Sequence, residues 1–278
     1  MSATTLRQTF TLIAAILACG ATGCVHASRG AAGRPLRVTS YNIGAGTHSD
    51  LHHIASELRA ENADVVALQE VDVHWHARSE FADQAAALAQ ALHMDFRFAH
   101  IYDLQGATPG APRREFGVAL LSRFPIVEFR NHRITRLSTQ EQGAAPSPMP
   151  GFLDVVLNVS GVQVRAFNTH LDYRTDPAVR VRQVADMLAI IRDVHEPTLL
   201  FGDLNAPPTA AELRPLLDRL TDSWGSANGD GFTYPADAPA KRIDYVLASP
   251  QFRVESAHVP ITEASDHRPL VANLWLYP

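Results

Sequence analysis

The chain has 278 residues, of which 46% are hydrophobic and 19% are charged, a composition that predicts a folded globular protein and excludes a disordered or collagen-like chain. Its 24 Lys and Arg residues against 29 Asp and Glu residues give a net charge of −5. Because basic residues that neutralise phosphates supply most non-specific affinity for nucleic acid, this charge argues against a protein whose main task is to coat nucleic acid, but it leaves a nuclease open.

Residues 1–27 are typical of an export signal, with Arg7 as the only charge and an apolar stretch over residues 10–18. The stretch is shorter than the roughly 20 apolar residues that a transmembrane helix needs. Two routes of maturation are open. Cleavage after Ala27 would release a soluble periplasmic or secreted protein. Alternatively, residues 21–24 resemble a bacterial lipobox, in which Cys24 would be lipidated and would attach the protein to a membrane.

Both cysteines of the chain, Cys19 and Cys24, lie inside this export segment. We therefore expect the folded domain, residues 36–278, to hold no disulfide, no cysteine-based zinc site and no cysteine nucleophile. The intervening residues 28–35 are rich in Gly, Ala and Arg and are expected to form a short linker.

From residue 36 onward, short apolar runs alternate with helical patterns, which is typical of an α/β protein. The runs predict strands over residues 36–43, 64–68, 116–122, 198–201, 243–247, 252–259 and 270–276, and a hairpin formed by residues 152–159 and 162–168. Helical spacing occurs over residues 50–60, 83–93, from Pro177 to Ile191, and 213–220. Strands joined sometimes by hairpins and sometimes by helices indicate mixed sheets covered by helices.

Two segments are candidates for a substrate-facing rim. Residues 135–151 contain three prolines among polar residues and predict a long loop, either mobile or part of a binding rim. Trp75, in the segment His74-Trp75-His76, can either face a substrate or be buried in the core.

Polar side chains lie where the predicted strands end, and strand ends converge at one edge of packed sheets. The polar residues at these strand ends are Asn42, Glu70, His170, Asp203, Asn205, Asp244, Asp266 and His267. Taken singly, each has another explanation, such as a turn former or a satisfied core histidine. Together, carboxylates and amides without cysteine suit a hard cation such as Mg²⁺ or Mn²⁺, and two histidines supply groups that titrate near neutrality.

Seven short segments occur in a recognisable order: Tyr41-Asn42, Gln69-Glu70, Ser122-Arg123, Thr169-His170, Gly202-Asp203-Leu204-Asn205, Ile243-Asp244-Tyr245 and Ser265-Asp266-His267. In this order the chain resembles the endonuclease/exonuclease/phosphatase superfamily, which includes nucleases, neutral sphingomyelinases, inositol polyphosphate 5-phosphatases and deadenylases. The resemblance covers essentially the whole chain after the export signal. It implies a four-layer α/β sandwich, with two mixed β-sheets packed face to face and helices outside.

The resemblance also implies a metal site and an oriented histidine. Glu70, with Asn42 and Asp266, corresponds to the family's Mg²⁺ site, for which Mn²⁺ is a substitute. The cation would bind a phosphate oxygen and offset the charge that develops there. Asp244 corresponds to the carboxylate that orients His267, the family's base or phosphate-binding histidine.

The remaining catalytic positions concern the attacking water and the leaving group. Asp203 and Asn205 resemble the pair that positions and activates the water, and the choice between Asp203 and His267 as the base stays open. His170 resembles the histidine that hydrogen-bonds the phosphate or protonates the leaving oxygen. In the abasic-site nucleases an Asn holds this place, so His170 points to the other branches. Glu115 is expected either to pair with His170 or to be an exposed charge.

These roles predict a metal-dependent hydrolase of phosphate esters, chiefly a phosphodiesterase. The export signal predicts that it acts outside the cytoplasm, and we expect a monomer. Its substrate class stays open between nucleic acid, a lipid head group and a small phosphoester, so an exported nuclease and a sphingomyelinase-type enzyme are both alternatives. A different alternative is an envelope binding module that keeps the fold without turnover. Such a module is expected to have lost a catalytic residue, whereas this chain has Glu70, Asp203, Asp266 and His267.

Overall fold

The computed structural model of the protein describes residues 1–2, 33–227 and 229–277. Apart from the first two residues, the expected export segment, Cys24 and most of the expected linker lie outside the described residues. Strand β1 begins at Arg34, so the end of the expected linker 28–35 already belongs to the sheet. In the described ranges, no helix has the length and apolar character needed to cross a membrane.

Sheet 1 has six strands in the order β11-β12-β1-β2-β4-β3. Within it β1 and β2 are parallel, and every other neighbouring pair is antiparallel. Its strands are β1 (Arg34–Asn42), β2 (Val65–Val73), β3 (Asp95–Leu104), β4 (Arg114–Ser122), β11 (Phe252–His258) and β12 (Leu270–Leu276).

Sheet 2 repeats this pattern, with six strands in the order β5-β6-β7-β8-β10-β9. Here β7 and β8 form the parallel pair, again among antiparallel neighbours. Its strands are β5 (Ile126–Arg136), β6 (Ser147–Val159), β7 (Val162–His170), β8 (Thr198–Asp203), β9 (Thr221–Asp222) and β10 (Asp244–Ala248).

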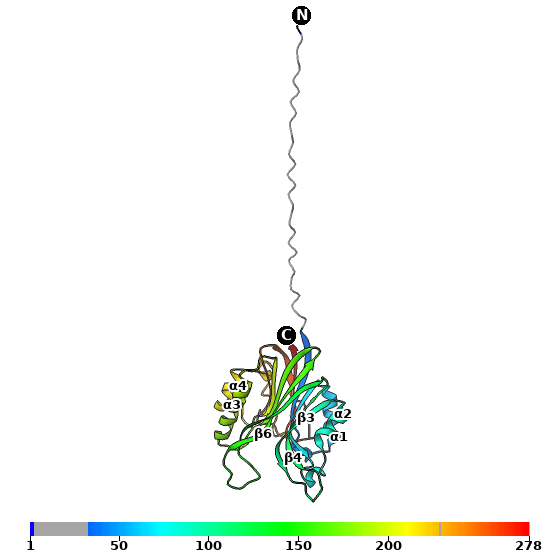
Figure 1. Ribbon diagram of the computed structural model, residues 1–278, viewed down its shortest axis with the longest axis vertical. Coiled ribbons are helices and arrows are strands. Elements are labelled where there is room, and N and C mark those ends of the chain that lie inside the picture. Colours follow the sequence, from blue (N-terminus) through cyan, green and yellow to red (C-terminus); the bar gives the residue numbers. More distant parts are fainter. Residues whose placement is uncertain (3–32, 228, 278) are drawn as a thin grey trace. The chain divides into compact units, whose positions relative to one another are not determined.

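The two sheets pack face to face with helices outside, as predicted. In β2, Val65 and Ala67 point into the core between the sheets, while Val66 and Leu68 pack under helices α1 (Leu51–Glu61) and α2 (Gln84–Leu92), because side chains alternate along a strand. Helices α3 (Ala178–Ile191) and α4 (Arg214–Leu217) cover the outer face of sheet 2. Figure 1 shows these two helix pairs on opposite sides. The architecture is a four-layer α/β sandwich.

The helices begin and end where capping chemistry allows. The side chain of Asp50 accepts a hydrogen bond from the His53 amide at the start of α1, and Asp83 caps α2 in the same way through the Ala86 amide. Asn62 adopts a left-handed conformation at the end of α1, with φ of 51°. The described part of the chain also contains four short 3-10 helices: Gly44–Gly46, Ala77–Ser79, Ala211–Leu213 and Ser223–Ser226.

The predicted loop 135–151 is too long. Strand β5, which was not predicted, continues to Arg136, and β6 begins at Ser147, so only residues 137–146 connect them. Pro148 and Pro150 lack amide donors but keep their carbonyls, and these accept hydrogen bonds from the side chains of Arg133 and Arg136. Proline in this stretch therefore does not prevent an extended strand.

Two further sequence expectations differ from the structure. Strand β3, at the edge of sheet 1, was not predicted, because several of its side chains are exposed or only half-buried and it has no continuous apolar run. The helix predicted over 213–220 is a 3-10 turn followed by the single turn of α4. The chain must become extended immediately afterwards, since Thr221 pairs with Ala248 of β10.

Candidate active site

The carboxyl ends of the parallel strands of both sheets meet at one edge of the sandwich. Strand β1 ends at Asn42, β7 at His170 and β8 at Asp203. Asn42 Nδ2 of sheet 1 donates a hydrogen bond of 3.0 Å to Asp203 Oδ2 of sheet 2, although the two residues are 161 positions apart. The fold therefore brings these predicted site residues together, with Asn42 and Asp203 buried.

Glu70 reaches this edge because β2 contains a bulge. The predicted strand 64–68 is too short: β2 runs on to Val73, and its register with β4 shifts between Leu68 and Val71. Glu70 adopts a left-handed backbone conformation there, with φ of 52°, a strained geometry for a residue of this type. Its carboxylate Oε1 lies 3.3 Å from Asn42 Nδ2. The bulge thus turns the Glu70 side chain out of the regular strand alternation and toward the site.

A buried amide locks the two sheets together beside the site. Asn168 Nδ2 donates to the carbonyl oxygens of Leu68 and Ala119 at 2.9 and 2.8 Å. Its Oδ1 accepts from Gln69 Nε2 at 2.8 Å. Both amide side chains are fully buried, and Gln69 directly precedes Glu70. Sequence reasoning did not single out Asn168, although an amide at the end of the predicted strand 162–168 was a usable indication.

Asp203 lies at the centre of the site. Its Oδ2 is 3.4 Å from His170 Nε2 and 3.7 Å from His267 Nε2, besides the bond from Asn42. Burial raises the pKa of Asp203, and so does the charge of Asp244, whereas the charges of the two histidines counter this increase. One carboxylate therefore connects both predicted histidines, which makes it suited to exchange a proton with either ring.

Asn205 fixes the orientation of Asp203. The Asn205 amide N–H donates to Asp203 Oδ1 at 2.9 Å, and its side chain donates to the Leu171 carbonyl at 3.1 Å. Its φ of 51° is in the left-handed region, which Asn tolerates better than most residues. The half-buried side chain of Asn205 thus ties the loop after β8 to the end of β7.

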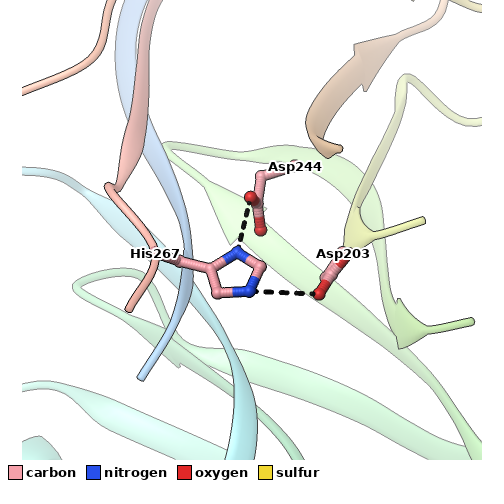
Figure 2. A group of neighbouring side chains, drawn as sticks. All are labelled: Asp203, Asp244 and His267. Carbon is pink, nitrogen blue, oxygen red and sulfur yellow. Dashed lines mark hydrogen bonds and ion pairs between the residues drawn. The ribbon is translucent and has the colours of Figure 1, made fainter. Parts of the chain in front are cut away.

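His267 is held between two carboxylates, as Figure 2 shows. Its Nδ1 lies 2.9 Å from Asp244 Oδ2, and the Thr233 hydroxyl donates to the same oxygen at 2.5 Å. Burial lowers the pKa of His267, but the charge and hydrogen bond of Asp244, with the charges of Asp203 and Asp266, outweigh burial and raise the pKa to about 10. Thr233 was not predicted. It acts on the ring through Asp244.

Glu70 and Asp266 form a pair of carboxylates suited to a hard cation. Among the described residues, neither lies within 4.0 Å of a basic side chain. Both carboxylates are linked to Asn42: its Nδ2 lies 3.3 Å from Glu70 Oε1, and Ser265 Oγ donates to its carbonyl at 2.8 Å and lies 3.3 Å from Asp266 Oδ1. A Cβ added to Gly44 would lie 3.0 Å from Asp266 Oδ1, so this glycine leaves room at the carboxylate. The donor set fits Mg²⁺ or Mn²⁺.

The hydrogen bonds of Asn42 also position other residues of the site. Its Oδ1 accepts from the Gly44 amide at 3.0 Å, while its Nδ2 faces the carboxylates of Glu70 and Asp203. Asn42 therefore fixes these two carboxylates relative to each other, and its direct binding of a cation stays a prediction.

A second group also has metal-ligating side chains. Asp203, Asp244 and His267 offer ligand atoms within 4.8 Å of one another, and all three are buried. Asp244 Oδ1 has no hydrogen-bond partner among the described residues. However, a charged His267 ring already supplies a positive charge between the two carboxylates. The group is therefore better suited to proton handling, and the Glu70 and Asp266 pair is the stronger candidate for the cation.

Glu115 does not have the partner that sequence analysis considered for it. Its carboxylate lies 3.2 Å from His100 Nδ1 on the neighbouring strand β3, and in the described part of the chain it forms no ion pair with His170. The reason is the strand register, since His100 of β3 lies opposite Gly117 of β4, two residues from Glu115. His170 instead contacts Asp203. Glu115 is half-buried, so it is not the fully exposed charge of the alternative either.

The fold and this site define the class of protein: a two-sheet sandwich with carboxylates, amides and histidines gathered at one edge. The sequence profile of the Endonuclease/Exonuclease/phosphatase family matches residues 39–267. The chain therefore belongs to this family, whose members are hydrolytic phosphoesterases, including nucleases, and generally depend on a divalent metal.

Individual relatives are distant. The chain is 25% identical to the uncharacterized protein YbhP of Escherichia coli (strain K12) over 81% of its own length and 88% of that protein. It is 29% identical to an endonuclease/exonuclease/phosphatase structure from Beutenbergia cavernae, with a TM-score of 0.71, covering 87% of this chain and 72% of that one. The mannosyl-6-phosphatase Bt3783 of Bacteroides thetaiotaomicron shares the fold at 21% identity, with a TM-score of 0.63 and coverage of 86% and 99%.

Proposed function

We propose that the protein is a divalent-metal-dependent phosphodiesterase that acts outside the cytoplasm through an activated water. The observation that carries the proposal is the position of Asp203. Its carboxylate faces both histidines and is joined through Asn42 to Glu70. Proton-transfer groups and a candidate cation site are thus within one hydrogen-bonded unit, an arrangement suited to hydrolysis of a phosphate ester.

The cation site is assigned to Glu70 and Asp266, with Mg²⁺ as the expected ion. A bound divalent cation polarises the phosphate and offsets the negative charge that develops on its oxygens, which is worth several kcal/mol. Asn42 and Ser265 keep the two carboxylates in place through the contacts at 3.3 Å. Replacement of either carboxylate should therefore weaken the binding of the cation more than it lowers the free energy of unfolding.

The attacking water is assigned to the space beside Asp203 and His267. The proton that the water loses can pass to Asp203 Oδ2, which lies 3.7 Å from His267 Nε2. His267 Nε2 can accept it only when the ring is neutral, which is the minor form at neutral pH because the pKa of His267 is raised to about 10. The Asn205 amide holds the carboxylate, and Asp244 holds the ring, so neither group must reorganise during the reaction.

His170 is assigned to the phosphate or the leaving oxygen. Its side chain is 15% exposed and lies at the end of β7, 3.4 Å from Asp203. A partly exposed imidazole whose Nε2 faces a buried carboxylate can donate a hydrogen bond outward through its other nitrogen. This role requires the ring to face the substrate side of the site.

Location and maturation are part of the proposal. The export signal predicted over residues 1–27 supports action in the periplasm, outside the cell, or from a membrane anchor at Cys24. The mass of the mature protein distinguishes the two routes, because cleavage after Ala27 leaves Ser28 as the first residue, whereas the lipoprotein route leaves an acylated Cys24. Size-exclusion chromatography tests the expected monomer.

The central test is hydrolysis of bis-p-nitrophenyl phosphate against p-nitrophenyl phosphate, with Mg²⁺, with Mn²⁺ and with EDTA. We expect diester hydrolysis that EDTA abolishes, and a loss in kcat on the order of 10² or more in His267→Ala. The matched control is His258→Ala, since His258 pairs with Glu61 outside the site. Hydrolysis unchanged in His267→Ala would refute the site. Absence of turnover with all esters would favour a binding module instead.

A further inference from the structure

A pocket of about 190 Å³ opens beside the candidate active site, with Glu70 and His170 in its wall. The chemistry proposed above uses none of its other lining residues, among them Tyr102, Phe116 and Tyr173. Pockets for drug-sized ligands usually measure about 300–1,000 Å³, so this one can hold a single ring-sized group and not a whole substrate.

One wall of the pocket is aromatic. The ring centroids of Tyr102 and Phe116 lie 6.3 Å apart in a stacked arrangement, and Trp75 lies 6.1 and 5.8 Å from them. These are distances at which aromatic rings attract one another. All three side chains are half-buried, so they keep part of their surface free. Trp75 packs against the two rings that line the pocket. It is therefore neither fully buried in the core nor itself part of the pocket lining.

The segment that carries Trp75 is rigidly held. The fully buried carboxylate of Asp72 accepts two hydrogen bonds from Arg78, at 2.9 and 2.8 Å, and one from the Ser79 hydroxyl at 2.8 Å. The Arg78 guanidinium lies 5.7 Å from the centroid of the Phe116 ring. Because a paired buried carboxylate fixes the turn after β2, the aromatic wall is pre-formed and needs no ligand to order it.

The pocket lining also contains an exposed tyrosine. Tyr173 is 64% exposed, and the guanidinium of Arg174 lies 5.1 Å from its ring centroid. The chain here is anchored by the buried side chain of Arg180, which donates to the carbonyls of Asp172 and Arg174 at 2.9 and 2.5 Å. An exposed aromatic ring on an anchored segment leaves its face available for stacking.

The pocket also has a buried positive charge. Arg136 donates to the carbonyls of Pro150, Gly151 and His170 at 2.9, 2.8 and 2.7 Å, and among the described residues no carboxylate lies within 4.0 Å of it. Burial lowers the pKa of Arg136 to about 10, so the guanidinium is still charged at neutral pH. An unpaired buried charge is costly, and an anionic ligand nearby would be attracted to it.

We infer that this pocket binds a planar aromatic ring joined to the scissile phosphate, as the base of a nucleotide ester is. The inference rests on the proposed function for the place of the phosphate. Stacking on Tyr102, Phe116 and Tyr173 accounts for the ring. A long acyl chain is a poor match, because the pocket is small and contains two guanidinium groups.

Binding measurements test this inference without turnover. Isothermal titration calorimetry compares adenosine 5′-monophosphate with ribose 5-phosphate, which has the same sugar and phosphate but no base. We expect the nucleotide to bind at least about ten-fold more tightly, since each stacked base contributes an effect of this size. Phenyl phosphate distinguishes a general ring subsite from one that needs a nucleobase, and octyl phosphate tests an alkyl chain.

Two pocket variants make the test specific. In Tyr173→Ala and in Phe116→Leu, the ratio of the two affinities should fall to about three-fold or less because a stacking face is lost. The matched control is Tyr277→Ala, an exposed tyrosine outside the pocket. Tyr173 is exposed, so its replacement tests the inference even if Phe116→Leu fails to fold.

Three outcomes would overturn the inference: equal affinity for nucleotide and sugar phosphate, a ratio unchanged in both pocket variants, or tighter binding of octyl phosphate. Hydrolysis of the chromogenic diester with no preference for the nucleotide would leave the proposed function in place and remove the ring subsite. Preference for the nucleotide without any hydrolysis would support the ring subsite and refute the proposed function.

Discussion

Replacing Asn168 with alanine should destabilise the protein far more than the loss of one exposed side chain. The change removes three buried hydrogen bonds, to the carbonyls of Leu68 and Ala119 and from Gln69. Each buried group left without a partner costs about 1–3 kcal/mol, and some relaxation is expected, so the free energy of unfolding should fall by about 3–5 kcal/mol. For a domain of this size that lowers Tm by about 10 °C.

The assay is thermal unfolding of Asn168→Ala beside Asn158→Ala. Asn158 is the matched control, because its exposed side chain accepts one hydrogen bond, from the Gly161 amide at 2.8 Å in a hairpin turn, and its loss should cost no more than about 1 kcal/mol. Equal Tm values for the two variants would refute the idea that the buried amide couples the sheets.

The same variant should impair hydrolysis even well below its Tm. The amide fixes Gln69, the neighbour of Glu70, to the strand that ends at His170. A displacement of about 1 Å between reacting groups can cost on the order of 10²-fold in rate, so we expect kcat of Asn168→Ala to fall at least about ten-fold. A wild-type kcat in the folded variant would show that the amide contributes to stability alone.

Three further predictions concern single groups of the site. Asp244→Asn should lower kcat for the diester on the order of 10²-fold with little change in KM, because it replaces the charged carboxylate that orients the His267 ring by a neutral amide, and steady-state kinetics check this. In metal-free protein, the raised pKa of His267 means that protonation of its ring stabilises the fold. This contribution is fully present below pH 6.5, the pKa of the histidine in the unfolded chain, and is lost as the pH rises to about 10. Urea unfolding in EDTA should therefore show a larger loss of stability over this range in wild type than in Asp244→Asn. Gly44→Ala should destabilise the fold by about 1 kcal/mol, owing to its φ of +53°, and raise the Mg²⁺ concentration needed for activity by crowding Asp266; an unchanged Mg²⁺ titration would count against that carboxylate as a ligand.

The helices and most strands follow from local patterns. The spacing of Ile54 and Leu58 after the cap at Asp50 places α1 to within one residue of the prediction, since burial of one face and a satisfied first turn are local effects. Strand β12 was predicted with its bounds unchanged, because its run is apolar except for Asn273 and too short for an ordinary helix.

The bulge at Glu70 was not predicted, because the strand was expected to end at Leu68. Leu68, Val71 and Val73 all pack under the helices, so the apolar period of two changes its phase between Leu68 and Val71. That change is visible in the sequence and is how an extra residue in a strand appears there. If the same residues are interpreted as the end of a strand, they give no reason why Glu70 points toward the site.

The sequence by itself determined which residue types stand at strand ends, and it predicted the family, the four-layer fold and most of the candidate site residues. Only the tertiary structure decided which of them touch. Asp203 faces His170, His267 and Asn42, whereas Glu115 contacts His100. The physical reason is that these contacts join residues far apart in the chain across two sheets, and their partners depend on how the sheets pack, which no local pattern of side chains specifies.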